Sequence, residues 1–243
     1  MPYRRLPNTD KARLKALNIA LSKGRDLPPF KLAFSQKSNQ RLQNFLSCYE
    51  NAMSFYRHAY SVQTKKNSEY VSSLKKARMY TSHFIQVLNM AINRGEMQDS
   101  ARKYFGLVGY ESRIPPLNTE MDVIKWGELL INGEAKRLLD GNSPVTNPTI
   151  ALVKVRYETF LEKYHYQKTL QKNTSRAWDK LSELRKEADM IILQVWNEVE
   201  ESFKDLPDDL KREKAKEYGL VYVYRKNELN NINFFDARQT GAG

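Results

Sequence analysis

The chain has 243 residues and a formal net charge of +12, and 41% of its residues are hydrophobic. This length and composition suffice to bury a core, which excludes wholesale disorder. Cys48 is the single cysteine, so an internal disulfide and a zinc cage built from several cysteines are excluded. No apolar run reaches about 18 residues and the N-terminus has no signal-like apolar core, so we expect a cytoplasmic protein without a membrane partner.

The positive charge is concentrated at the start of the chain. Residues 1–44 carry ten lysines and arginines against Asp10 and Asp26, a net charge of +8. The remaining 199 residues are close to balanced, at +4. The sequence therefore predicts that any electrostatic attraction to a partner is centred on the N-terminal segment.

The N-terminal segment contains one predicted short helix. Asn8 or Thr9 can cap its start, leucines recur at spacings of three and four, and Gly24 suits the position just past its end. The following "RDLPPF" breaks the helix, because two consecutive prolines cannot continue it. We interpret residues 1–40 as a basic arm that stays free of the rest of the fold.

Two longer regions are predicted to form helical hairpins. In residues 41–110 and again in residues 147–228, apolar residues recur at helical spacing over two successive stretches. The polar sequences Thr64–Asn67 and Gln171–Asn173 are interpreted as the turns between the two helices of each hairpin. Helices of this length are typical of bundles.

Short matches between the two hairpins indicate a duplication. Gln-Val-x-Asn occurs at Gln86–Asn89 and Gln194–Asn197, and Gly-Leu at Gly106–Leu107 and Gly219–Leu220. The alternative is two amphipathic hairpins of similar composition. The repeated Gln and Asn either form matched polar contacts that fix the register of the two hairpins, or are boundary residues inherited with the repeat.

Residues 111–146 are predicted to hold a bridging helix. Thr119 and Asp122 resemble a capping box, and Gly141 suits the end. Its expected packing stripe is apolar and consists of Ile124, Ile131, Ala135 and Leu138. After an alternation of valine and tyrosine, residues 229–243 are predicted to form a mobile tail.

These elements together predict an all-α protein. Its parts are the N-terminal helical arm, two duplicated long antiparallel helical hairpins that form a four-helix-bundle-like core, and the bridging helix.

Candidate catalytic and metal-binding residues are few. Glu162 and His165 have the spacing of metal ligands in ferritin-like bundles, but the partner hairpin offers Arg57 and His58 in place of a second acid. Cys48 lies beside an apolar stripe near Glu50, which favours a packed, inert thiol. We predict no enzyme activity, no metal and no cofactor.

Four stretches carry a family resemblance: "RRLPNTDKARLKAL", "PPFKLAFSQ", "SHFIQVLNMAI" and "NPTIALVKVRYE". On these stretches the chain resembles a family of uncharacterised, cytosolic, all-helical proteins of Bacteroidota. The resemblance implies a bacterial helical protein and assigns no catalytic residue.

The basic arm is the strongest functional lead. Lysine and arginine attract phosphates, and the release of counterions favours such binding. We predict a non-catalytic protein whose arm contacts a polyanion, either RNA or DNA or a ribosome-like surface; an acidic protein surface is a further candidate partner. The alternative is a structural protein that acts through protein–protein contacts or self-association of its bundle. The predicted nucleic-acid-binding residues are Arg4, Arg5, Lys11, Arg13, Lys15, Lys23, Arg25 and Lys31.

Overall fold

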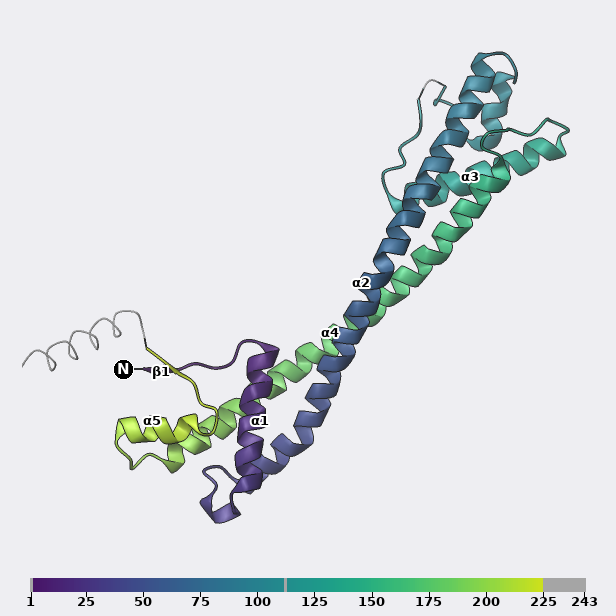
Figure 1. Cartoon of the computed structure of the whole chain (residues 1–243). Coiled ribbons are helices and arrows are strands. Elements are labelled where there is room, and N and C mark those ends of the chain that lie inside the picture. The colour runs from purple at the N-terminus through teal and green to yellow at the C-terminus, as the bar shows by residue number, and fades with distance from the viewer. Residues whose placement is uncertain (1, 112, 225–243) are drawn as a thin grey trace, which may run out of the picture. The chain divides into compact units, whose positions relative to one another are not determined.

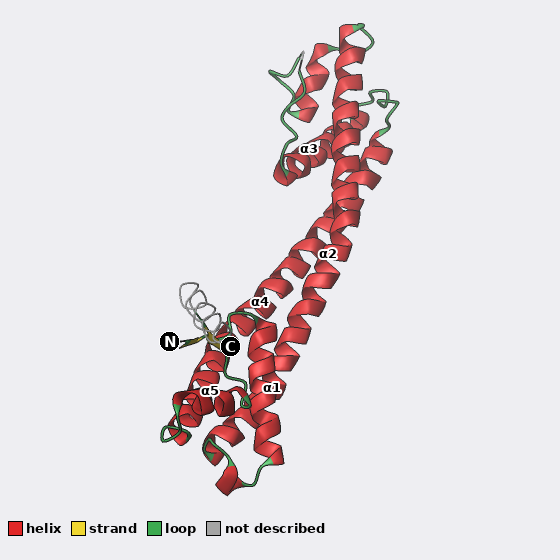
Figure 2. Ribbon diagram, turned by 60° about the vertical axis from the view of Figure 1, so that its left-hand side comes forward, coloured by secondary structure: helices red, strands yellow, loops and turns green. Residues whose placement is uncertain are grey.

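The computed structural model describes residues 2–111 and 113–224. Helix is the dominant secondary structure of the described chain and strand is nearly absent, so the prediction of an all-α protein is confirmed (Figures 1 and 2). The predicted tail at 229–243 lies outside the described residues. The elements are β1 (Tyr3–Arg4), α1 (Asp10–Asp26), the 3-10 helix η1 (Pro29–Lys31), α2 (Gln36–Asn93), the 3-10 helix η2 (Asp99–Phe105), α3 (Glu120–Leu139), α4 (Ile150–Ser202), α5 (Asp208–Lys216) and β2 (Tyr222–Val223).

The long helices α2 and α4 are continuous, with 58 and 53 residues. The turns predicted at Thr64–Asn67 and Gln171–Asn173 are therefore wrong. Both segments are polar, but neither contains glycine or proline, so nothing in them breaks a helix. The Thr64 hydroxyl donates to the carbonyl oxygen of Tyr60 one turn earlier, which keeps this polar side chain compatible with the helix.

The chain divides into two compact units, and each long helix contributes to both. Of the described residues, unit 1 comprises 2–58 and 175–224, and unit 2 comprises 59–111 and 113–174. Within each unit α2 and α4 run antiparallel. In unit 1 the Ser38 hydroxyl lies 2.7 Å from Glu198, and the rings of Tyr56 and Trp178 pack at 5.3 Å. Each half of α2 thus packs against α4. The two halves of α2 do not fold back on each other as the predicted hairpin of residues 41–110 requires.

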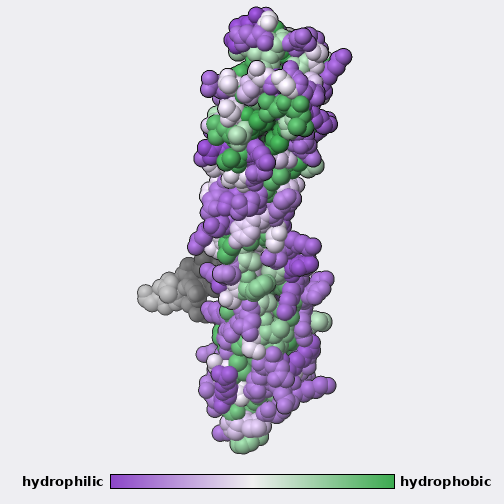
Figure 3. All heavy atoms as spheres, turned by 90° about the vertical axis from the view of Figure 1, so that its right-hand side faces the viewer, coloured by the Kyte–Doolittle hydropathy of each residue, from purple (hydrophilic) through white to green (hydrophobic). Residues whose placement is uncertain are grey.

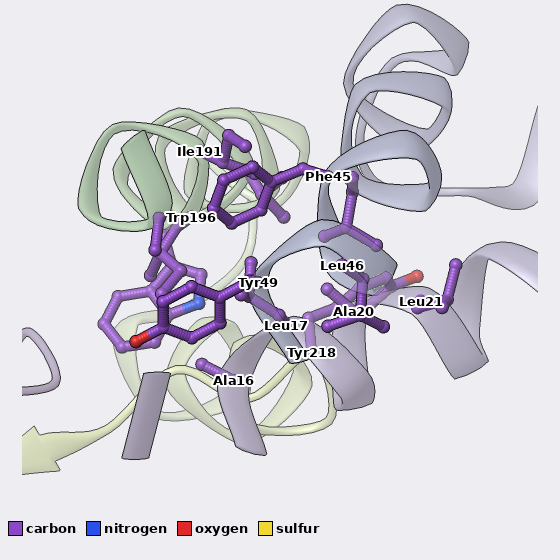
Figure 4. Close-up of a cluster of buried hydrophobic side chains, with 14 of the residues drawn as sticks. Ala16, Leu17, Ala20, Leu21, Phe45, Leu46, Tyr49, Ile191, Trp196 and Tyr218 are labelled. Carbon is purple, nitrogen blue, oxygen red and sulfur yellow. The ribbon is translucent and has the colours of Figure 1, made fainter. Parts of the chain in front are cut away.

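The core of unit 1 is formed by α1, the first part of α2, the last part of α4 and α5. Leu17, Tyr49 and Trp196 are almost completely buried there (Figure 4). Gly24 lies inside α1 and does not end it, because the helix continues to Asp26. A Cβ at Gly24 would meet the Asn39 side chain at 2.3 Å, so the glycine permits a close approach of α2.

The core of unit 2 is formed by α3, the remainder of α2, the first part of α4 and η2. Phe84, Phe105 and Phe160 are fully buried. The capping box of Thr119 and Asp122 is present, as predicted.

The predicted packing stripe of α3 is not its buried face. The face that packs on the unit 2 core carries Val123, Trp126 and Leu130. Ile124 and Ile131 are half-buried, whereas Ala135 and Leu138 are exposed. The apolar residues of α3 thus occupy two faces, and one of them is left uncovered in the described part of the chain.

The same order of elements occurs twice. A short helix capped by threonine (α1 after Thr9, α3 after Thr119) precedes a long helix, and a closing helix follows. Both closing helices are followed by a left-handed glycine and a buried leucine, at Gly106–Leu107 directly after η2 and at Gly219–Leu220 shortly after α5. This shared order favours the duplication hypothesis, with the short helix as part of the repeat.

Across the described residues, none of the helices combines the length and the apolar character that crossing a membrane requires.

Candidate functional site

The N-terminal arm is an integral part of unit 1 and packs against the other segments of that unit. Tyr3 and Arg4 in β1 pair with Val223 and Tyr222 in β2 in antiparallel register, and the backbone N–H of Arg5 donates to the carbonyl oxygen of Val221 at 2.8 Å. The apolar face of α1 is buried in the same core. The expectation of a free arm is therefore wrong, because its leucines and alanines have a packing partner.

Three of the eight predicted site residues are neutralised inside the fold. Arg4 binds Glu200 at 2.8 Å, and Lys23 binds Glu217 at 2.8 Å. Arg13 donates a bidentate pair of hydrogen bonds to the Asp189 carboxylate, at 2.7 and 3.0 Å. The partner acids lie on α4 and just after α5, so far away in sequence that no local pattern indicates these pairs.

The other five predicted site residues face solvent. Arg5, Lys11, Lys15, Arg25 and Lys31 are exposed, and none of them forms an ion pair with a described residue. These cations are free to attract an anion.

Arg5 and Lys15 line an open pocket of about 370 Å³, together with Lys216 from the end of α5. Among the described residues, its lining contains no aspartate and no glutamate. The rest of the lining is largely apolar and is supplied by the segment after β1, by α1, by α4 and by the segment after α5. Those residues are Leu6, Pro7, Asn8, Ala12, Ala16, Ile19, Trp196, Gly219, Leu220 and Val221.

The glycine in the pocket wall has a conformational role. Gly219 has a φ of +90°, a conformation that side-chain-bearing residues rarely adopt, and a Cβ at this position would lie 3.4 Å from the Ile19 side chain of α1. The chain can therefore reverse after α5 and run back along α1, which brings Lys216 and Leu220 to the same pocket as Lys15.

A charged cluster fixes the start of α1 beside this pocket. Arg185 donates two hydrogen bonds of 2.8 Å to the Asp10 carboxylate, and the Tyr49 hydroxyl donates a third at 3.0 Å. The hydrogen bond from Arg185 is the main reason that the pKa of Asp10 lies below its usual value, although burial opposes it. Burial, with Asp10 as its acceptor, raises the pKa of Tyr49.

The other candidates from the sequence do not assemble into a site. Glu162 and His165 are exposed on α4, and in the described chain no group of three His, Cys, Asp or Glu side chains is placed to hold a metal ion. Cys48 is exposed rather than packed, which corrects the prediction. It lies on the outer side of α2, beside the buried stripe and not in it.

The repeated Gln and Asn residues do not form matched contacts. Asn89 is buried and binds Arg102 at 3.1 Å and the carbonyl oxygen of Tyr110 at 3.2 Å. Gln194 instead donates to the Ser38 hydroxyl at 2.9 Å. Gln86 and Asn197 are exposed. Asn89 and Gln194 each serve their own unit, so the interpretation as matched contacts is wrong, and the boundary interpretation fits the exposed Gln86 and Asn197 but not the buried Asn89.

Comparison with models of protein families, with curated proteins and with solved structures finds no match. The resemblance to a Bacteroidota family thus stays a prediction.

Proposed function

We propose that the protein binds a polyanion without catalysing a reaction, and that nucleic acid is the polyanion. The observation that carries this proposal is that five of the predicted site residues lack an acidic partner in the described chain: Arg5, Lys11, Lys15, Arg25 and Lys31. Because the fold holds the N-terminal segment in place, its cations are presented at fixed positions, which lowers the entropy lost on binding.

The test compares two variants with the same loss of charge. One replaces these five residues by glutamine. The control replaces five exposed lysines of unit 2, namely Lys65, Lys75, Lys76, Lys103 and Lys136. Affinity for a single-stranded oligonucleotide of mixed sequence is measured over a series of salt concentrations.

We expect the first variant to lose binding and the control to keep most of it. Each phosphate contact contributes about 0.7 to the slope of log affinity against log salt for a single strand, so five lost contacts reduce the slope by about 3.5. Equal losses in both variants would mean that net charge alone drives binding. If the unmodified chain retains an acidic protein but not the oligonucleotide, the polyanion is not nucleic acid and this proposal is wrong.

A second candidate function is self-association through α3, and the uncovered face of that helix favours it. Met121 and Leu138 are 62% and 39% exposed, and Leu139 is 86% exposed. Figure 3 shows hydrophobic atoms gathered on one side of unit 2, in the upper part of the view. Lys125 and Glu128 lie on the same side of α3 with Met121, so a second copy related by a twofold axis would place opposite charges against each other.

Sizing chromatography at low and high salt tests this candidate. Apolar self-association persists in high salt, whereas assembly that depends on polyanions fades. Replacing Met121 and Leu138 by glutamine should return the protein to the monomer. A monomer at every concentration and salt level would rule the candidate out.

A further inference from the structure

We propose that the pocket of unit 1 binds a small organic anion that has an apolar body and a carboxylate or phosphate head. This proposal does not rest on the nucleic-acid function. Small-molecule sites are typically concave, about 300–1,000 Å³ in volume, mostly apolar, and equipped with a few convergent polar groups. The pocket has about 370 Å³ and brings Arg5, Lys15 and Lys216 to a lining that is otherwise largely apolar.

The charges around the pocket select an anion. The neighbouring acids are already engaged, because Glu200 binds Arg4, Asp189 binds Arg13 and Glu217 binds Lys23. No acid lines the described part of the pocket. Its three cations therefore have no acidic partner among the described lining residues. An anionic head group would be attracted to these cations, and a cationic ligand would be repelled by them.

The apolar lining selects the rest of the ligand. Leu6 and Val221 are 43% and 49% exposed at the pocket, and Ile19 and Leu220 continue the same surface. A hydrated inorganic anion would leave these side chains in contact with water, whereas an alkyl or aromatic body would cover them. The pocket volume has room for about a dozen water-sized groups, and this is the upper limit on the part of the ligand that fits inside.

The pocket walls come from segments that the fold holds rigidly. The β1–β2 pairing and the bond from the Arg5 N–H to Val221 fix one side, and the Asp10 cluster fixes the start of α1 on the other. Trp196, from α4, lines the pocket next to Ala16 and is otherwise packed in the core (Figure 4). The site is therefore formed before a ligand arrives, which favours binding.

Calorimetry on the full chain tests the proposal with three probes of equal chain length: octanoate, octyl phosphate and octanol. We expect at least one of the two anions to bind at least tenfold more tightly than octanol, and the stronger anion identifies the preferred head group. If octanol binds as well as both anions, or if no probe binds, the proposal is wrong.

Two matched triple variants locate the site. Arg5, Lys15 and Lys216 line the pocket, and their replacement by glutamine should weaken anion binding at least tenfold. Lys11, Arg25 and Lys31 do not line it, and their replacement removes the same charge but should change the affinity less than twofold. An equal loss in both variants would show a general effect of net charge and would overturn the proposal.

A third variant keeps the charge constant. Ala12 lies on α1 and lines the pocket, and Ala12→Leu adds apolar volume inside it. We expect this variant to lose octanoate and octyl phosphate binding while it retains the oligonucleotide, which separates this proposal from the nucleic-acid function. Far-UV circular dichroism confirms that each variant is folded. If the pocket triple variant does not fold, Ala12→Leu decides, and unchanged anion binding by Ala12→Leu would overturn the proposal.

Discussion

Helices α1 and α3 begin in the same way but present different surfaces. Each follows Asn-Thr and starts with an acid, and each acid is held by a tyrosine of α2 and a cation of α4. Asp10 binds Tyr49 and Arg185, whereas Glu120 binds Tyr70 and, at 3.3 Å, Lys168. The anchor is thus common to both units. The outward face is basic on α1 and partly apolar on α3, so the face rather than the anchor distinguishes what each helix can bind.

The largest expected effect concerns a fully buried ion pair in α3, which has no counterpart among the partly exposed ion pairs of α1. Glu134 and Arg137 are 0% and 2% exposed, and their side chains bind each other at 2.8 and 3.0 Å. Glu134 also accepts the backbone N–H of Val145. Glu134→Gln leaves a buried arginine without its counter-charge, which we expect to lower the free energy of unfolding by about 3–5 kcal/mol.

Urea unfolding measures this effect, and Lys23→Gln is the comparison on α1. The Lys23–Glu217 pair is exposed, so its loss should cost no more than about 1 kcal/mol. Similar losses for the two variants would show that the buried pair has no special role in unit 2.

A smaller effect is expected from the close packing of α3. A Cβ at Gly133 would meet the carbonyl oxygen of Tyr104 at 2.5 Å, and this backbone atom cannot rotate away. We expect Gly133→Ala to cost about 1–3 kcal/mol in urea unfolding despite the better helix propensity of alanine. At Ser22, an exposed residue of α1, the substitution to alanine should be close to neutral. A neutral Gly133→Ala would mean that α3 can move away from η2.

The Asp10 cluster predicts a pH dependence. The hydrogen bond from Arg185 lowers the pKa of Asp10 in the folded protein relative to the unfolded chain. The resulting stabilisation is present above the unfolded pKa of about 3.9 and is lost as the pH falls through the lower folded pKa. Asp10→Asn should therefore reduce the free energy of unfolding by about 2 kcal/mol at pH 7, and by progressively less toward pH 2.

Urea unfolding at a series of pH values measures this convergence. Glu183→Gln, at an exposed position on α4, is the control and should run parallel to the unmodified protein. If the Asp10→Asn difference stays constant from pH 7 to pH 2, the charge of Asp10 does not supply the stabilisation.

The smallest effect is expected at the two caps. The Thr9 hydroxyl accepts the N–H of Ala12 at 3.2 Å, and the Thr119 hydroxyl accepts the N–H of Asp122 at 3.1 Å. Thr9→Ala and Thr119→Ala should each lower the unfolding free energy by about 1 kcal/mol. Thr119→Ala should cost slightly more, because Asp122 completes a capping box on α3 only. The reverse order would indicate that the first turn of α1 depends more on its cap.

Residue spacing in the sequence correctly predicted the features that depend only on neighbouring residues. The helical class, a cap at Asn8 or Thr9 (the structure has Thr9), the capping box at Thr119 and the end of α3 before Gly141 follow from short-range spacing and backbone preference. The turns at Thr64–Asn67 and Gln171–Asn173 were mispredicted because a polar interval in a stripe resembles a turn. Such an interval breaks a helix only where glycine or proline removes the backbone preference.

Local sequence is enough to predict that the chain is helical, that its N-terminal segment is basic, and where α1 and α3 start, since these properties depend on neighbours along the chain. Tertiary structure decided which cations stay exposed, because the acids that neutralise Arg4, Arg13 and Lys23 lie more than 170 residues away. It also decided that Arg5, Lys15 and Lys216 share one pocket and that α3 leaves an apolar face uncovered. Both depend on contacts between segments that lie far apart in the chain, and no local spacing encodes such contacts.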